Sequence, residues 1–173
     1  MANFPQRRAG GRRRSDRGPR EDKEFQQKII DIRRVTRVVA GGKRMRFRAT
    51  VALGDGKGRV GIGIGKGQDV TGAVSKGSTI ARKHLLTVPI VNGTIPHEVR
   101  IKFGAAKILF KPAPQGSGVI AGGPIRSILE LAGIRNIVAK MLGTSNKVNN
   151  VYAAMAALGS LQTREDLKRK LKA

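Results

Sequence analysis

The sequence contains no cysteine and no tryptophan, and it has few aromatic or acidic residues. Without cysteine the chain can form no disulfide bond, no zinc ribbon and no thiol nucleophile. One tyrosine and five phenylalanines leave little material for stacking against unpaired bases. Only 11 Asp and Glu stand against 35 Lys and Arg, which gives a formal net charge of +24. A chain of this charge repels itself, so we expect its partner to be a polyanion.

Long apolar stretches are also missing, and this argues against a membrane as the polyanion. No uninterrupted apolar run approaches the roughly 18 residues that a spanning helix needs, and no helix has an aromatic-lined apolar face. The N-terminus has no apolar segment after its arginines, and the pair Arg7-Arg8 alone does not make a twin-arginine signal. We therefore expect a cytoplasmic protein whose partner is a nucleic acid.

Length and composition favour two small domains. A chain of 173 residues with 39% apolar residues can bury two small cores but not a large one. Residues 1–22 are rich in Arg and Gly with little to bury, which predicts a disordered arm that contacts RNA. The predicted domains span residues 23–87 and 88–160. A basic helix follows at 161–173, because Thr163 and Asp166 have the spacing of a capping box.

The first predicted domain is built from three strands and a helix. Residues 28–39 and 59–67 alternate between apolar and other residues, and residues 69–86 have helical spacing. The clearest strand is 44–53, whose odd positions are apolar and whose opposite face carries Arg44, Arg46, Arg48 and Thr50. We expect Val60, Ile62 and Ile64 to continue the apolar face. The glycines between them would let another backbone approach closely.

The second predicted domain is β-rich with a βαβα order. Strands are expected near residues 86–91, 99–103, 107–111 and 137–142, the first as an edge strand or a linker because it contains Pro89. An Asn92-Gly93 pair predicts a tight turn. Helices are expected from Pro124 to Gly133 and over 149–158. Together the two domains predict an α+β fold.

Glycine spacing raises the possibility of a nucleotide site. Gly56-x-Gly58-x-x-Gly61 leads into a strand, whereas the dinucleotide fingerprint must open a helix. The similar run from Gly116 to Ala121 does open a helix, but no carboxylate follows it until Glu165 except Glu130. The segment Gly122-Gly123-Pro124 either presents backbone N–H groups to an anion or simply turns the chain. Both readings stay open.

Candidates for catalysis are few. His84 falls on the apolar arc of its predicted helix, where a packed histidine is expected. His97 follows Pro96 without a partner at metal-ligand spacing, and Asp55 lies in a glycine turn where Asp bonds its own backbone. The sequence therefore predicts no enzyme, no metal site and no cofactor.

Basic residues, by contrast, gather near defined strands. Their clustering predicts phosphate contacts to folded or helical RNA rather than reading of unpaired bases. The candidate RNA-binding residues are Arg33, Arg34, Arg37, Lys43, Arg44, Arg46, Arg48, Lys57, Arg59, Lys66, Asn146 and Lys147.

Three motifs, in one register over about residues 22–165, carry a resemblance to a known family. The runs 54–67 (GDGKGRVGIGIGKG), 116–126 (GSGVIAGGPIR) and 143–149 (GTSNKVN) resemble the bacterial small-subunit ribosomal protein five family. Ile62 and Ile64 stand where relatives often carry an aromatic residue. The resemblance implies a first domain similar to double-stranded-RNA-binding domains. It implies a second domain of the type that several ribosomal proteins share with small-molecule kinases.

The resemblance also implies a role and partners. It implies a structural constituent of the small ribosomal subunit that binds its RNA near the mRNA entry channel. It further implies contact with ribosomal proteins four and eight, and support of translational accuracy with protein four. By position, the turn Arg34-Val35-Thr36-Arg37 would lie near the spectinomycin site, and Gly118 and Arg126 would meet protein four.

Parts of the sequence are also compatible with two other classes of function. The fold of the second domain is shared with kinases, but the one loop that opens a helix lacks a catalytic carboxylate. A DNA-architectural protein is permitted by the basic arm alone.

Overall fold

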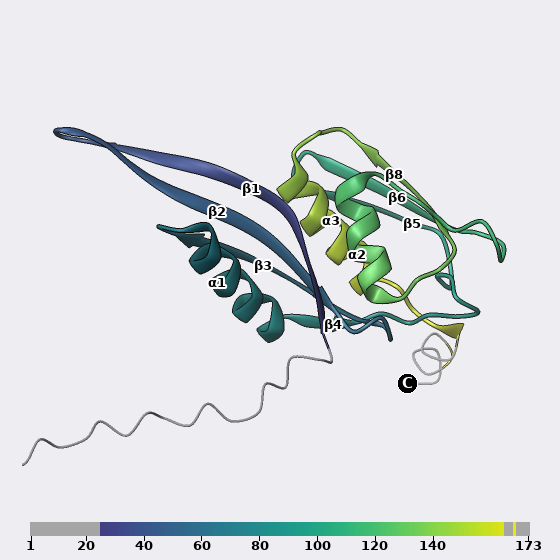
Figure 1. Cartoon of the computed structure of the whole chain (residues 1–173). Coiled ribbons are helices and arrows are strands. Elements are labelled where there is room, and N and C mark those ends of the chain that lie inside the picture. The colour runs from purple at the N-terminus through teal and green to yellow at the C-terminus, as the bar shows by residue number, and fades with distance from the viewer. Residues whose placement is uncertain (1–24, 165–167, 169–173) are drawn as a thin grey trace, which may run out of the picture.

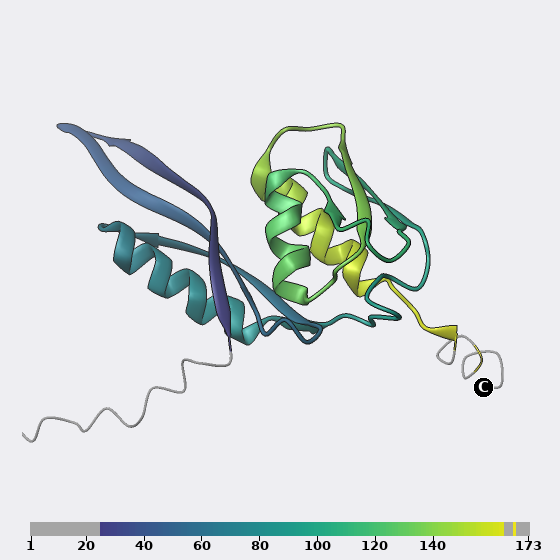
Figure 2. The same cartoon turned by 45° about the vertical axis from the view of Figure 1, so that its right-hand side comes forward.

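The computed structural model describes residues 25–164 and residue 168, and it contains two four-stranded sheets. The strand orders are β1-β2-β3-β4 and β5-β6-β8-β7. From one side to the other the layers are helix α1, the first sheet, helices α2 and α3, and the second sheet (Figure 1, Figure 2). The predicted α+β fold with two domains is confirmed. The predicted arm, and residues 165–167 and 169–173 of the predicted last helix, lie outside the described residues.

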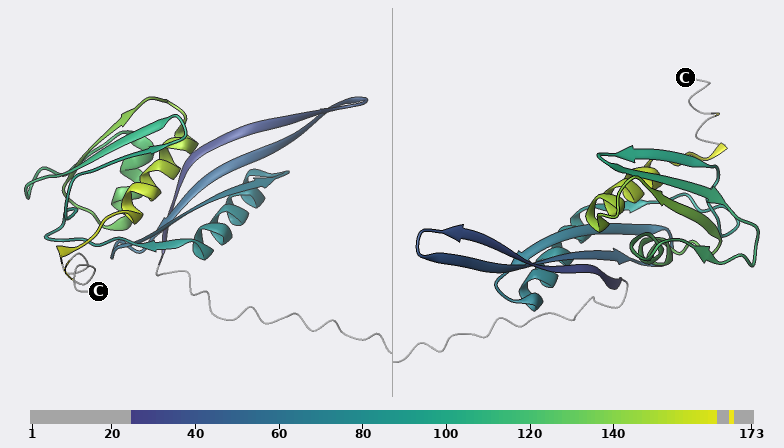
Figure 3. Two further views of the ribbon diagram at one scale, coloured as in Figure 1. Left: turned by 180° about the vertical axis from the view of Figure 1, so that it is seen from behind. Right: turned by 90° about the horizontal axis from the view of Figure 1, so that it is seen from above.

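The first sheet is dominated by a long hairpin. Strand β1 (Gln26–Val39) runs antiparallel to β2 (Gly42–Gly54) along its whole length. Strand β3 (Arg59–Gly67) pairs with β2 only from Phe47 onward, so the distal part of the hairpin projects beyond the sheet (Figure 3). A register shift between Ile29 and Asp31 turns these two side chains to opposite faces.

Helix α1 (Val70–Lys83) covers the glycine-lined side of β3. A Cβ atom on Gly63 or Gly65 would lie within 3.0 Å of the α1 backbone at Gly77 or Ala73. Gly77 is itself buried on the facing side of the helix. The predicted close approach of a second backbone is confirmed, and the approaching backbone belongs to α1.

The prediction that Val60, Ile62 and Ile64 continue the apolar face of β2 is wrong. Ile62 pairs with Ala52 and Ile64 pairs with Thr50, so these side chains share the face opposite to Val51. That face is buried beneath the second domain, and even Thr50 is only 1% exposed. The inner half of the sheet is thus covered on both sides. Alternation of apolar and polar residues predicts burial of one face only, so it fails here.

The second sheet is covered by helices on one face only. Its strands are β5 (Val99–Phe103), β6 (Ala106–Pro112), β7 (Val119–Ile120) and β8 (Ile137–Leu142). Helices α2 (Gly123–Ala132) and α3 (Lys147–Gly159) lie between this sheet and the first. The predicted strands 99–103, 107–111 and 137–142 are present as β5, β6 and β8, and both predicted helices are present. The segment 86–91, expected as an edge strand or a linker, adds no strand to this sheet. Strand β7 was missed. Two residues are too few for a periodic signal.

The connection between the domains differs from the prediction. Residues 85–87 form strand β4 (Leu85–Thr87) at the edge of the first sheet, where a helix was expected to continue. His84 is therefore the exposed residue at the C-terminal end of α1, and the expectation of a packed histidine is wrong. The predicted turn at Asn92-Gly93 is present, with positive φ at both residues.

The two domains share one apolar core and a hydrogen-bonded junction. Ala52, Val60 and Ile62 of the first sheet pack in the same buried cluster as the inner faces of α2 and α3. The glycine turn after β2 meets the C-terminal end of α2, where the N–H groups of Gly56 and Gly58 donate to the carbonyls of Leu131 and Ala132, each at 2.9 Å. These are carbonyls that a helix end leaves without internal partners.

We predict that Gly63→Ala lowers the free energy of unfolding by about 3 kcal/mol, because the backbone of α1 at Gly77 and Ala81 leaves no room for the added Cβ. Gly72→Ala is the matched control on α1, since a Cβ there meets nothing within 4 Å. It should leave stability unchanged or raise it by up to about 1 kcal/mol. Urea unfolding followed by circular dichroism measures both. Equal stability of the two variants would contradict the packing of α1 on the glycine strand.

Candidate nucleic-acid interface

Six of the predicted RNA-binding residues share one face of the hairpin. Arg33, Arg48 and Lys66 form a row across three strands, and Arg37 lies opposite Arg44. Arg46 is on the same face, because side chains alternate along a strand. The face is on the side of the sheet that the second domain covers further in. We call this set the basic hairpin face: Arg33, Arg37, Arg44, Arg46, Arg48 and Lys66.

Like charges oppose one another directly across these strands. Such pairs destabilise a sheet, because cross-strand side chains lie only about 5 Å apart. Among the described residues, the one carboxylate that pairs with this face is Asp31, which accepts from Arg33 Nε at 3.0 Å. The Nε atom of Arg48 is buried without a hydrogen-bond partner. The face therefore presents cationic charge that the described part of the protein does not neutralise.

The distal part of the hairpin is hollowed into a shallow groove of about 350 Å³. Val35 and Val39 contribute aliphatic surface, and Arg37, Arg44 and Arg46 line the same groove. Cationic side chains beside an aliphatic surface suit a polyanion that is held by its charges rather than by stacking. Four of the six residues of the basic hairpin face, Arg37, Arg44, Arg46 and Lys66, therefore line one groove.

Asp31 closes the inner end of the basic hairpin face. Its Oδ1 accepts from Lys147 Nζ at 3.0 Å, while its side chain is only 9% exposed. Lys147 is the first residue of α3, so this ion pair joins the two domains. Burial acts to raise the pKa of Asp31, but hydrogen bonds and charge from Lys147 and Arg33 outweigh it and hold the pKa below its ordinary value. The predicted residue Lys147 therefore lies beside the face, paired to a carboxylate.

The remaining five predicted residues lie elsewhere. Arg34 and Lys43 are on the opposite face of the hairpin, where Arg34 pairs in register with Phe47. Lys57 and Arg59 are at the far end of the sheet. The Asn146 side chain caps α3 by accepting from the N–H of Val148 at 3.1 Å. The structure therefore does not bring these five together with the basic hairpin face.

Asp55 organises the glycine turn at that far end, as the sequence predicts. Its Oδ1 accepts from the N–H groups of Lys57 at 2.7 Å and Arg59 at 3.0 Å. Its Oδ2 accepts from Arg59 Nε at 2.6 Å, and the Arg59 guanidinium lies 5.2 Å from the centre of the Phe25 ring. Burial acts to raise the pKa of Asp55, but the hydrogen bonds from Arg59 and the backbone outweigh it and lower the pKa. Arg59 thus serves a turn that carries the domain junction.

His97 has a structural partner on each ring nitrogen. Its Nε2 accepts from the N–H of Gln162 at 3.2 Å, and Nδ1 lies 3.0 Å from the carbonyl oxygen of Glu98. Among the described residues, no three His, Asp or Glu side chains gather in a way that would hold a metal ion. No helix in that part of the chain is long and apolar enough to cross a membrane.

Of the two predicted protein-contact residues, Gly118 lies in the loop before α2 and Arg126 lies in the first half of the helix. Gly118 has a φ of +69° and its N–H donates to Oδ1 of Asn136 at 3.2 Å, while Arg126 is exposed on the helix. The same oxygen of Asn136 accepts from the N–H of Gly116 at 3.1 Å. Buried Asn136 therefore holds the loop before α2. Sequence reasoning missed it, because a single Asn beside a strand has no distinctive spacing.

The expectation that Arg34-Val35-Thr36-Arg37 forms a turn is wrong. These residues lie within strand β1, and the hairpin turns at Ala40 and Gly41. A run with two Arg and a Thr carries no signal that separates an exposed strand from a turn.

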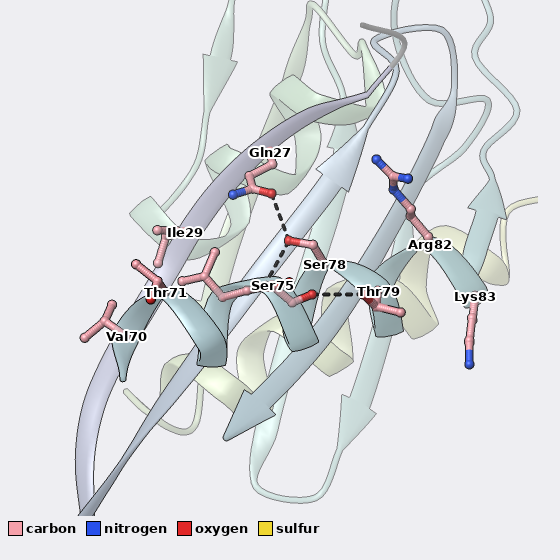
Figure 4. A pocket seen from close by; sticks show the side chains of 10 residues that line it. Gln27, Ile29, Val70, Thr71, Ser75, Ser78, Thr79, Arg82 and Lys83 are labelled. Atoms are coloured by element: carbon pink, nitrogen blue, oxygen red, sulfur yellow. Dashed lines mark hydrogen bonds between the residues drawn. The ribbon is translucent and has the colours of Figure 1, made fainter. Parts of the chain in front are cut away.

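A larger groove lies on the other side of the first sheet, between α1 and the start of β1 (Figure 4). It measures about 820 Å³. The hydroxyl of Ser78 is within 2.8 Å of Gln27 Oε1 and 3.0 Å of the Val74 carbonyl, and that of Thr79 bonds to the Ser75 carbonyl. Since these hydroxyls are used within the protein, the basic hairpin face remains the better candidate interface.

The fold is that of a two-domain α+β protein, and one face of its hairpin carries cationic charge that the described residues do not neutralise. Family models for ribosomal protein S5 match the chain twice, with the N-terminal domain at residues 25–89 and the C-terminal domain at residues 101–171. The chain belongs to the ribosomal protein S5 family.

Curated relatives are similar over most of their length. The chain is 49% identical to small ribosomal subunit protein uS5 of Trichormus variabilis over 156 residues, which cover 90% of each protein. It is 50% identical to uS5 of Thermus thermophilus, over 84% of this chain and 90% of that protein. It is 51% identical to uS5c of Guillardia theta, over 87% and 90% respectively. Membership of this family makes the chain a non-enzymatic structural constituent of the small ribosomal subunit, located on the ribosome in the cytoplasm.

We predict that acid destabilises the protein partly through Asp31. Because its pKa is lower in the folded protein than in the unfolded chain, its stabilisation is fully present above the ordinary value of 3.8 and is lost as pH falls through the folded pKa. Asp31→Asn should be less stable at pH 7, and its unfolding free energy should depend less on pH below 4. Urea titrations from pH 6 downward test this. An unchanged pH dependence would contradict the domain-joining ion pair.

Proposed function

We propose that the basic hairpin face binds ribosomal RNA of the small subunit. The observation that carries this proposal is the set of like charges that oppose one another across the strands. Within the described residues, Asp31 is the one carboxylate that pairs with them, so an external polyanion is needed to neutralise the rest. Family membership supplies the context of the small subunit. Within that context RNA is the abundant polyanion.

The expected mode is contact with the sugar-phosphate backbone of folded or helical RNA. No aromatic side chain belongs to the basic hairpin face, so there is no platform for splayed bases. Five of its six cations are Arg, whose planar guanidinium makes paired hydrogen bonds to phosphate oxygens. Binding of this kind follows the shape of the RNA more than its sequence.

The finer role rests on the resemblance. We place the protein near the mRNA entry channel, where it would stabilise the RNA fold and contact ribosomal proteins four and eight. Gly118 and Arg126 are offered as contacts to protein four, through which the chain would support translational accuracy. The exposure of Arg126 and the fixed loop at Gly118 support a protein contact at this end of α2. Residues 34–37 of β1 remain our candidates for the segment near the spectinomycin site.

A general DNA-architectural protein is the competing proposal. The predicted arm would permit it, but the family points to RNA. Competition between small-subunit RNA and duplex DNA at moderate salt separates the two. Equal affinities would favour the DNA reading.

We predict that replacing Arg37, Arg44 and Arg46 by Gln weakens binding to small-subunit RNA by about 10- to 100-fold at physiological salt. The slope of log K against log salt should also fall by about 2, because three phosphate contacts are lost. Filter binding or fluorescence anisotropy at several salt concentrations measures both quantities. Since these side chains are exposed, the fold should be retained.

The matched control removes three exposed cations that lie away from this face, Lys76, Lys83 and Arg135, also by Gln. It changes net charge equally but should leave the slope close to that of the original protein. If both triple variants lose the same affinity, net charge rather than the basic hairpin face governs binding, and the proposed site is wrong.

A further inference from the structure

The second sheet has an uncovered outer face that is also cationic. Helices α2 and α3 pack on its inner face, where Ile108, Phe110 and Ile137 are buried (Figure 2). Since side chains alternate along a strand, those of the alternate positions are on the opposite face, where most of them are exposed. No described helix or strand covers that face (Figure 3). We call this set the outer sheet face: Arg100, Lys102, Lys107, Lys111 and Lys140, with the aliphatic residues Leu109, Ile120, Val138 and Leu142.

The pairing register arranges these residues in three rows. Arg100, Leu109 and Lys140 form one row, and Lys102, Lys107 and Leu142 form the next. In the third row, Lys111 lies beside Val138, which pairs with Ile120. Lys102 and Lys107 are directly opposite like charges, the same unfavourable arrangement that marks the hairpin.

One carboxylate lies near these five cations. Glu98 contacts Arg100 Nε at 3.2 Å and Lys111 Nζ at 3.6 Å, and all three side chains are more than 40% exposed. Ion pairs this exposed contribute little and are easily exchanged for other partners. Lys102, Lys107 and Lys140 have no carboxylate partner among the described residues. The outer sheet face therefore keeps a strong positive charge.

The composition of this face favours a nucleic-acid backbone over a protein. Four of its five cations are Lys, a residue that is depleted in protein–protein interfaces. Leu109 and Leu142 are each flanked by cations, and only Val138 and Ile120 are neighbouring apolar residues, so the aliphatic side chains form no continuous patch. The face carries no aromatic, amide or hydroxyl side chain that would read a base edge.

We propose that the outer sheet face is a second docking surface for the backbone of helical RNA, separate from the basic hairpin face. The proposal rests on the proposed function, since it assigns a second segment of the same class of ligand. Helices α2 and α3 lie between the two sheets. An RNA segment bound to the outer sheet face would therefore be a different segment from the one bound to the basic hairpin face. A chain with two such faces would hold two parts of a folded RNA together.

Lysine acylation of the full chain, read residue by residue with mass spectrometry, tests this proposal directly. The probes are protein-free small-subunit RNA and a short RNA duplex, at physiological salt. We expect both RNAs to slow acylation of Lys102, Lys107 and Lys140 several-fold. Lys76 and Lys83 of α1 should react as fast as without RNA, because they lie on the far side of the first sheet.

The possible results separate this proposal from the proposed function. Protection of Lys66, the lysine of the basic hairpin face, without protection of Lys102, Lys107 and Lys140 would overturn the second surface and leave the hairpin site standing. Protection of no lysine in the described residues would overturn both. Protection of the outer sheet face in assembled subunits, but not by protein-free RNA, would mean that a protein covers it and would also overturn the proposal.

Charge variants give an independent measurement. Replacing Lys102, Lys107 and Lys140 by Gln should lower the slope of log K against log salt by about 2. Replacing Ile120 and Leu142 by Ser should leave that slope unchanged, as should Lys76→Gln with Lys83→Gln. A loss of RNA affinity with the Ser variants but not with the Gln variants would contradict a phosphate contact.

Discussion

The structure depends on the inner half of strands β2 and β3 being buried on both faces. On one face the glycines of β3 let α1 pack against bare backbone, and on the other Ala52, Val60 and Ile62 enter the core of the second domain. Strands β2 and β3 contribute residues both to the packing under α1 and to the core of the second domain. A chain of this length can therefore support two domains although neither has a large core. The junction at the C-terminal end of α2 adds backbone hydrogen bonds to this shared packing.

The burial of only the inner half of the sheet also explains why the distal hairpin is exposed. The second domain covers only the inner part of the sheet, so β1 and β2 continue outward with no third strand beyond Phe47. The residues there contact no core. Even Met45, on the face opposite to Arg44 and Arg46, is 50% exposed. Burial therefore places no restriction on the distal strand, and cationic side chains that oppose one another are tolerated because the inner half anchors the strands.

Sequence reasoning predicted what depends on local signals and missed what depends on register. Pro124 and Gly133 bound α2 as expected, and the Asn92-Gly93 turn is present, because each relies on the conformational preference of one or two residues. The facing of Val60, Ile62 and Ile64 was wrong, since period-two alternation does not say which face meets which helix. For the same reason, the twelve predicted RNA-binding residues include six that share one face and six that lie elsewhere, of which Arg59, Asn146 and Lys147 have local partners.

Asp31 stabilises the fold at the edge of the surface that we propose for RNA. Its carboxylate joins β1 to α3 through Lys147 and lowers the repulsion at Arg33, which stabilises the folded chain. The same negative charge lies at the inner end of the surface that we propose for RNA. Replacing it by Asn would therefore weaken the junction between domains while raising the positive charge of the basic hairpin face. Asp31 is thus located at the contact between the two domains, whereas the outer part of the hairpin, residues 32–47, contains no carboxylate.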